Sequence, residues 1–315
     1  MTTATPAQPL AERYPDLDPT WAGLLDAARA TGVPPLTELT PEALRERVRG
    51  GDRLCDPGPD MLDVEDVVVD GTLLVRRYLP QRLRTGAVLV WFHGGGWMTG
   101  DLAYSDGFCR LLADGVGCEV RSVDYQLAPE HPFPAAVEDA LRAVRWTADG
   151  DRRIIVAGDS AGANLAAVVT QELRASRNVT LIGQVLVYPV LDHDVTRASY
   201  RRNVDIVLGA ADMGWFFDRY APNPADRDSW RFAPLRTHST AGLPPAVVAV
   251  AGHDPLYDEG VAYADRLRQA RVPVDLLEFG SLAHGFLRFT GPVAAAADAA
   301  SRIVVATSAL VAAAS

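Results

Sequence analysis

Short apolar runs alternate with longer amphipathic stretches from about Ala87 onward, and Gly and Pro residues mark the joins. Most of the apolar runs are continuous, as parallel strands covered on both faces of a sheet must be. Strands are expected over residues 87–92, 119–124, 153–157, 182–188, 246–251 and 274–279. This rhythm is typical of βαβ units and predicts an α/β fold.

The amphipathic stretches between these runs predict helices that flank the sheet. Helices are expected over residues 105–115, 134–148, 161–175 and 257–271, and a last one, rich in Ala and Val, over 292–313. Upstream, residues 64–69 and 73–78 are joined by Asp70-Gly71. This pattern predicts an antiparallel hairpin at the edge of the sheet.

Two segments break the alternation. The first suggests two helices, over residues 19–30 and 40–48, and the second contains the aromatic run Met213-Gly214-Trp215-Phe216-Phe217. We expect both to lie above the sheet as a mainly helical cap, with most of these aromatics anchoring the insertion to the core. The predicted division is an N-terminal cap segment (1–50), a first core part (51–191), a second cap insertion (192–240) and a last core part (241–315).

Composition narrows the class of protein. The 315 residues are 48% hydrophobic, enough for one compact catalytic unit with insertions. A formal net charge of -10 should repel phosphate backbones, so no nucleic-acid partner is expected. The first residues lack the basic start and apolar core of a secretory signal, and no run is long and charge-free enough to span a bilayer. A cytoplasmic protein without a membrane partner is therefore expected.

Neither the cysteines nor the acidic loops have the ligand spacing of a typical metal site. Cys55, Cys109 and Cys118 lack metal-ligand spacing and indicate buried or free thiols in a reducing compartment, with a Cys109–Cys118 disulfide as the alternative. Asp192-His193-Asp194 has no third well-spaced histidine or cysteine and is interpreted as a polar loop. No metal and no cofactor are expected.

A nucleophile motif follows the third of these strands. Gly158-Asp159-Ser160-Ala161-Gly162 stands between an apolar strand and a helix-forming run, the context that makes G-x-S-x-G meaningful. On a sharp, strained strand-to-helix turn, side chains two residues before and after the serine would collide with neighbouring elements. The helix N-terminus favours the negative charge that develops beside it. Ser160 is therefore the predicted nucleophile, and an ordinary glycine turn is the alternative.

A second glycine-rich turn, His93-Gly94-Gly95-Gly96-Trp97, closes another apolar strand. Bare backbone N–H groups stabilise an oxyanion without reorganising when the charge develops. We assign Gly94 and Gly95 as donors together with the amide of Ala161, with an uncertainty of one residue among the glycines. His93 is expected to hold the loop in place. A phosphate-binding loop is disfavoured, because neither G-x-G-x-x-G nor a following Lys-Ser/Thr is present.

The base and its orienting acid are expected in the order Ser, acid, His along the chain. Asp254 and His284 each follow an apolar strand, so both should lie at the carboxyl edge of the sheet beside Ser160. His284 would accept and return the proton, and Asp254 would fix its tautomer. Asp258 and Glu259 compete for the role of the acid but enter the first turn of a helix, where acids commonly serve the helix dipole.

Taken together, these motifs resemble the hormone-sensitive-lipase family of carboxylesterases, also called bacterial esterase family IV. The resemblance spans residues from about 90 to 290. It is carried by His93-Gly94-Gly95-Gly96-Trp97, Asp124-Tyr125-Gln126-Leu127-Ala128-Pro129-Glu130, Gly158-Asp159-Ser160-Ala161-Gly162-Ala163-Asn164-Leu165, Asp254-Pro255-Leu256-Tyr257-Asp258-Glu259-Gly260 and His284-Gly285-Phe286. The resemblance implies an eight-stranded α/β-hydrolase core with a helical cap, esterase activity on short- to medium-chain acyl esters without a cofactor, and frequent dimerisation through the last strand and helix.

Two positions depart from the family pattern. Gln126 stands where the family usually has Arg, which puts a charged pairing near that turn in doubt. Ala163 replaces a usual Gly and should strengthen the helix that follows the nucleophile.

The substrate is predicted to be a small apolar ester, because cap and loop residues near the site are apolar and aromatic. They include Trp21, Leu24, Leu25, Trp97, Trp215, Phe216, Leu256 and Phe286. Of these, Trp97, Trp215, Leu256 and Phe286 are the candidates for direct contact.

The rival hypotheses are an amidase, deacetylase or lactone-opening enzyme on the same site, and a binding protein that keeps the fold without turnover. The presence of Ser160, Asp254 and His284 together argues against the binding protein.

Overall fold

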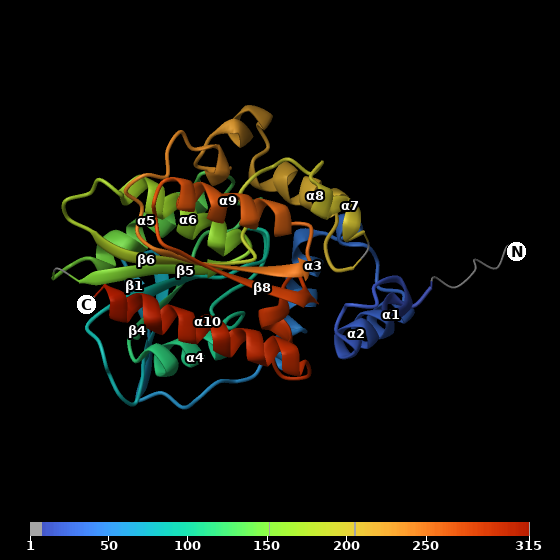
Figure 1. Cartoon of the computed structure of the whole chain (residues 1–315), viewed down its shortest axis with the longest axis horizontal. Helices are drawn as coiled ribbons and strands as arrows, with labels where there is room; N and C mark the ends of the chain where they lie inside the picture. The colour runs from blue at the N-terminus through green and yellow to red at the C-terminus, as the bar shows by residue number, and fades with distance from the viewer. Residues whose placement is uncertain (1–7, 151, 205, 315) are drawn as a thin grey trace, which may run out of the picture.

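An eight-stranded sheet runs through the middle of the molecule in the computed structural model, which describes residues 8–150, 152–204 and 206–314 (Figure 1). The strands are β1 Asp63–Val69, β2 Leu73–Leu79, β3 Val88–Phe92, β4 Glu119–Asp124, β5 Arg153–Asp159, β6 Thr180–Val187, β7 Ala246–His253 and β8 Val274–Ala283. Their order is β1-β2-β4-β3-β5-β6-β7-β8. Only β2 runs antiparallel to its neighbours β1 and β4, and the other pairs are parallel. The predicted α/β fold with an eight-stranded, mostly parallel sheet flanked by helices is confirmed.

The hairpin at the β1 edge follows from its turn residues. Asp70 has a φ of 49° and Gly71 a φ of 77°, and Thr72 N–H donates to the carbonyl of Val69 at 3.2 Å. Two successive positive φ values match the right-handed twist of the flanking strands, which is why Asp-Gly is favoured there. The predicted hairpin is present.

Helices cover both faces of the sheet (Figure 1). Helices α4 Asp106–Val116 and α10 Ala294–Ala313 lie on one face, and α5 Ala135–Thr147, α6 Ala161–Leu173 and α9 Tyr257–Gln269 lie on the other. One buried apolar cluster fills each interface, with Leu112 and Ile303 in the first and Val137 and Leu165 in the second. The continuous apolar strands are thus explained by burial on two sides.

Helix α10 corrects one expectation from the sequence. Its 20 residues are long and apolar enough to cross a membrane by length and composition, despite Asp298 and Arg302. In the structure, α10 packs against α4 and the strands β6, β7 and β8. Ile303 is fully buried there. The apolar face of α10 therefore belongs to the protein core, and a core helix of this kind meets the same length and composition test.

Helices from both segments predicted as caps lie at one end of the sheet, where β8 points (Figure 1). The first contains α1 Leu10–Arg13, α2 Pro19–Ala30, η1 Leu36–Glu38 and α3 Pro41–Arg49, followed by η2 Asp52–Leu54; the second contains α7 Ala198–Arg202, α8 Ala210–Tyr220, η3 Pro224–Asp228 and η4 Pro234–Arg236. They touch each other, since Tyr14 Oη donates to the carbonyl of Val204 at 2.6 Å and α8 contacts η1. Residues 1–7 of the predicted first segment lie outside the described residues.

Two questions left open by the sequence have answers in the core. Gln126 donates from its backbone N and its Nε2 to Asp139 Oδ2, at 3.0 and 3.1 Å. Arg142, one helical turn beyond Asp139, pairs with Asp139 Oδ1 at 2.8 Å and supplies the cation that Gln126 lacks. Cys109 and Cys118 are buried free thiols, so the alternative disulfide is not formed.

Candidate active site

Ser160 occupies a strained turn between β5 and α6. Its backbone has φ 54° and ψ -117°, outside the regions that L-residues normally adopt. The turn requires Gly162, because a Cβ there would lie 1.9 Å from the carbonyl oxygen of Phe92. Ser160 N–H donates to the carbonyl of Val187 at 2.9 Å, which fixes the turn to β6. The hydroxyl is thereby held away from the sheet at the start of a buried helix.

The structure brings Ser160, His284 and Asp254 into one hydrogen-bonded row. Ser160 Oγ lies 3.0 Å from His284 Nε2, and His284 Nδ1 lies 2.8 Å from Asp254 Oδ2. The Asp254 side chain is fully buried, and its Oδ1 accepts the backbone N–H of Leu256 at 2.8 Å. The edge of the Tyr188 ring packs against the imidazole, with ring centroids 4.9 Å apart. These contacts fix the histidine ring between a hydroxyl and a carboxylate.

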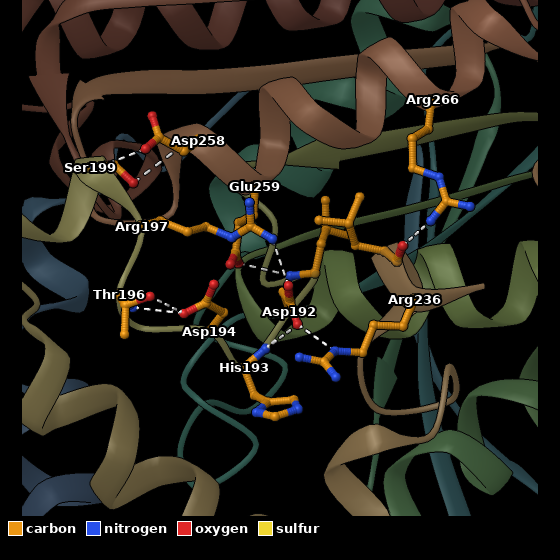
Figure 2. Close-up of polar contacts among 12 residues, drawn as sticks. Asp192, His193, Asp194, Thr196, Arg197, Ser199, Arg236, Asp258, Glu259 and Arg266 are labelled. Carbon is orange, nitrogen blue, oxygen red and sulfur yellow. Dashed lines mark hydrogen bonds and ion pairs between the residues drawn. The ribbon is translucent and has the colours of Figure 1, made fainter. Parts of the chain in front are cut away.

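The two competing acids are engaged elsewhere (Figure 2). Asp258 accepts the backbone N–H of Ser199 at 2.7 Å and pairs with Arg202 at 3.1 Å, so it holds α7 in place. Glu259 is fully buried and accepts the N–H of Leu191 at 2.8 Å. Burial raises the pKa of Glu259 well above its ordinary value. Neither carboxyl has a hydrogen bond with His284.

The polar triplet Asp192-His193-Asp194 also forms ion pairs and a turn (Figure 2). Asp192 binds Arg197 at 2.6 Å and Arg236 at 2.8 Å, and Asp194 accepts from the N–H and hydroxyl of Thr196. The two arginines hold the pKa of Asp192 below its ordinary value against the effect of burial. This triplet anchors the start of the second cap segment to the residues before β7.

Hydrogen bonds hold several backbone groups of the loop from His93 to Thr99. Tyr125 Oη donates to the carbonyl of His93 at 2.7 Å, and the Gly94 N–H donates to Asp159 Oδ1 at 2.7 Å. The N–H and the hydroxyl of Thr99 both donate to the carbonyl of Gly95 at 3.0 Å. The Ala128 N–H donates to the carbonyl of Trp97 at 2.8 Å, and His93 Nδ1 lies 2.8 Å from the carbonyl oxygen of Gly94. Within the described ranges, the amides of Gly95 and Gly96 donate no hydrogen bond. Both residues line the cavity that contains Ser160 and His284.

Gly94 is therefore at odds with its predicted role. Its amide is already donated to Asp159, and it does not line the cavity among the described residues. Gly95 and Gly96, which line the cavity, lie one residue further along than the predicted pair of donors. The backbone of Gly96 has φ +63°, and a Cβ there would lie 2.3 Å from Phe216, so only glycine fits.

Two buried ionisable groups support this loop. His93 is fully buried and stacks on Tyr125 with centroids 4.3 Å apart, and burial lowers the pKa of His93 to about 4. It is therefore neutral at pH 7 and holds the loop, as expected. Burial raises the pKa of Asp159 to about 6, although its hydrogen bond from Gly94 opposes that rise. Asp159 also accepts the Tyr188 hydroxyl at 3.2 Å, so one carboxylate joins the loop from His93 to Thr99 to the residue that packs on His284.

A cavity of about 160 Å³ opens over Ser160. Both segments predicted as caps line it, the first with Leu36, Leu44 and Val48 and the second with Val207, Leu208, Met213 and Phe216. The core contributes Gly95, Gly96, Trp97, Thr99, Tyr104, Ser160, Val190 and His284. Apart from the serine, threonine, tyrosine and histidine side chains, the wall is apolar.

Of the four predicted contact residues, only Trp97 lines this cavity. In the described chain, Trp215 instead packs under the Arg219 guanidinium, 3.8 Å from its ring. Leu256 is buried in the core and contributes its backbone amide to Asp254. Phe286 packs between Tyr188 and Phe279 in the apolar layer under β8. Among the described residues, Trp215, Leu256 and Phe286 do not line this cavity, so their contact with a substrate stays a prediction from the sequence. Aromatic and aliphatic composition does not show which side of an element faces the site.

Comparison with known proteins now identifies the family. Residues 89–288 match the family described as alpha/beta hydrolase fold. The chain is 39% identical to Esterase LipI of Mycobacterium tuberculosis over 319 aligned positions, covering 94% of this chain and 96% of that protein. The chain belongs to the hormone-sensitive-lipase family of α/β-hydrolases.

Other members of the family are similar along most of their length. This hydrolase is 36% identical to the Ethyl acetate hydrolase of Pseudomonas putida, covering 84% of this chain and 89% of that one. The solved structure of a hyperthermophilic esterase from Pyrobaculum calidifontis superposes with a TM-score of 0.87 at 32% identity, over 94% of this chain and 99% of the other. The resemblance predicted from the motifs is confirmed, and these relatives are all named for ester hydrolysis.

Proposed function

We propose that this hydrolase is a carboxylesterase that cleaves short- to medium-chain acyl esters through an acyl-enzyme on Ser160. The row from Ser160 Oγ through His284 to the buried Asp254 carboxylate carries the proposal. A serine hydroxyl is a weak nucleophile until a neighbouring base accepts its proton. His284 Nε2 is within reach of that proton, and Asp254 favours the tautomer that leaves Nε2 free to accept it.

In the proposed reaction, Ser160 Oγ attacks the ester carbonyl carbon and its proton passes to His284. The alkoxide of the tetrahedral intermediate is stabilised by the amides of Gly95, Gly96 and Ala161. Collapse releases the alcohol, which takes the proton from His284, and leaves the acyl group on Ser160. Water then attacks this acyl-enzyme with the same base, which releases the acid and restores the serine.

The size and polarity of the cavity support a small apolar acyl group. A cavity of about 160 Å³ is close to the roughly 150 Å³ that holds one benzene molecule in an apolar protein core. Its aliphatic wall would bury the methylene groups of the substrate, each stabilising the complex by about 0.8 kcal/mol. We therefore expect the best turnover with acyl chains of a few carbons.

The test is hydrolysis of a p-nitrophenyl ester series from acetate to palmitate by wild type and Ser160→Ala. Turnover is expected to peak at short or medium chains and to vanish in the variant. Activity that survives in Ser160→Ala would overturn the assignment of the nucleophile. Hydrolysis of matching amides but not esters would favour the amidase hypothesis.

The same assay tests the choice of acid. Asp254→Asn should lower kcat by roughly 10³- to 10⁴-fold with little change in KM, because the amide favours the wrong imidazole tautomer. Asp258→Asn is the matched control, since that carboxylate contacts α7 and not His284. An inactive Asp258→Asn beside an active Asp254→Asn would reverse the assignment.

We also propose that the first and second cap segments form one cap over the hydrolase core, supported by the shared wall of the cavity. A cytoplasmic location and a homodimer stay predictions from the sequence and the family resemblance.

A further inference from the structure

Arg45 stands out because its guanidinium joins a cap helix to the oxyanion loop. The side chain projects from α3 and is only one-fifth exposed. Its Nε donates to the carbonyl of Met98 at 2.9 Å, and its Nη2 donates to the carbonyl of Ala128 at 3.0 Å. Nη1 and Nη2 also bind the Glu130 carboxylate at 2.8 and 2.6 Å. One planar group thus holds two backbone carbonyls and a carboxylate.

These contacts lie directly on the turn that presents Gly95 and Gly96. Met98 N–H donates to the carbonyl of Gly95 at 3.1 Å, so Met98 belongs to the same turn. The carbonyl of Trp97 accepts the N–H of Ala128 at 2.8 Å, and Ala128 offers its own carbonyl to Arg45. The result is a closed circuit of hydrogen bonds through Trp97, Ala128, Arg45 and Met98.

Helix α3 is also tied to the other half of the site. Arg288, four residues after His284, donates from Nη2 to the carbonyl of Val48 at 2.8 Å and pairs with Asp52 at 2.8 Å. Its guanidinium stacks 4.1 Å from the centre of the Tyr104 ring. Since Leu44 and Val48 of the same helix line the cavity, the wall of the substrate site and the catalytic loops are joined through α3.

We propose that Arg45 is a positioning residue for the oxyanion loop and couples closure of the cap over a bound ester to the alignment of the Gly95 and Gly96 amides. When α3 is seated, Arg45 holds the Met98 carbonyl and the turn keeps the amides directed at the tetrahedral oxygen. When α3 moves away, that constraint is lost. This inference rests on the proposed esterase function, but it concerns a residue that does not touch the substrate.

The test compares Arg45→Met with Arg49→Met, a change on the same helix. Arg49 is about two-thirds exposed and makes a single long ion pair with Asp101, at 3.4 Å. In Arg45→Met, kcat on a short p-nitrophenyl ester is expected to fall roughly ten- to a hundredfold, because a misplacement of about 1 Å can cost about 10²-fold. KM should change less than about threefold, since the lost stabilisation applies to the transition state. Arg49→Met should match wild type.

A second readout separates positioning from mere stability. An alkyl trifluoromethyl ketone adds the Ser160 oxygen to its carbonyl carbon and leaves an alkoxide where the reaction places its oxyanion. Its inhibition constant should rise in Arg45→Met by about the same factor as kcat falls. Should Arg45→Met not fold, Arg45→Lys serves, because one ammonium group cannot span Glu130 and both carbonyls.

Equal kcat and equal ketone affinity in wild type and folded Arg45 variants would overturn the proposal. A loss of activity that only follows the folded fraction measured by circular dichroism, with unchanged ketone affinity, would overturn it as well. Failure of the esterase function itself would be seen differently, as wild-type protein without Ser160-dependent turnover.

Discussion

At the residue scale, the site depends on where a few backbone and carboxylate groups find partners. Asp159 is the clearest case. It is next to Ser160 in sequence, yet its side chain points to the oxyanion loop and accepts Gly94 N–H at 2.7 Å. A hydrogen bond to an ionised acceptor is about twice as strong as a neutral one. Protonation of Asp159 should therefore loosen the loop.

This gives a pH prediction. Burial raises the pKa of Asp159 to about 6, so the carboxyl is ionised above that pH and becomes protonated as the pH falls through it. In wild type, kcat should fall more steeply below pH 6 than it would if a single titrating group on the enzyme controlled activity. Asp159→Asn keeps an oxygen acceptor but cannot titrate, so its acid limb should be shallower. Profiles of kcat from pH 4.5 to 8 for both proteins provide the measurement, and identical slopes would contradict it.

At the scale of elements, most strands and flanking helices could be predicted from the sequence, and the structure shows why. Most of the strands from β3 to β8 were predicted because burial on two faces leaves continuous apolar runs. The hairpin of β1 and β2 was predicted from its Asp70-Gly71 turn, and the flanking helices from their amphipathic pattern. The strands β5, β7 and β8 run further than expected, to Asp159, His253 and Ala283, so that each delivers its site residue directly at the strand end.

What the sequence could not show is which neighbours meet across the fold. Trp215 and Phe216 are adjacent on α8, but successive helical residues point about 100° apart, so only one of them faces Gly96. The choice among the three glycine amides likewise depends on Asp159 taking the first of them. Both are long-range contacts that no local pattern encodes.

Phe216 and Trp215 form a natural pair for a specificity test. Removing the Phe216 ring enlarges the apolar cavity, so Phe216→Ala should move the preferred acyl chain to a length greater by two or more carbons. Trp215→Ala should keep the wild-type optimum, because that ring packs beneath Arg219. The p-nitrophenyl ester series measures both. The same optimum in all three proteins would show that Phe216 does not limit the site.

At the scale of the whole molecule, the proposed catalytic residues lie in the smaller of two cavities and not in the larger one. The larger groove, about 740 Å³, lies where β7 and β8 begin and α10 ends, lined by Ala246, Val274 and Leu310 among others. The smaller cavity holds Ser160 and His284 at the other end of the same strands. The groove involves the last strand and helix, where the family resemblance places a dimer contact.

The role of α10 can be tested by the stability of the entire fold. Ile303 is fully buried, whereas Val305, two residues on, is 68% exposed. Ile303→Ala should lower the free energy of unfolding by about 2–4 kcal/mol through the cavity that it leaves. Val305→Ala should change the free energy by less than about 0.5 kcal/mol. Urea unfolding followed by circular dichroism measures both, and equal effects would contradict a core role for this face of α10.

The contact between Gly96 and Phe216 also means that position 96 tolerates substitution less well than position 216. A side chain at position 96 would need both a shifted Phe216 and an unfavourable positive φ, so mutations there begin with a double penalty. Position 216 can lose its ring without any change at Gly96. A change in substrate preference is therefore expected to arise at position 216 before position 96.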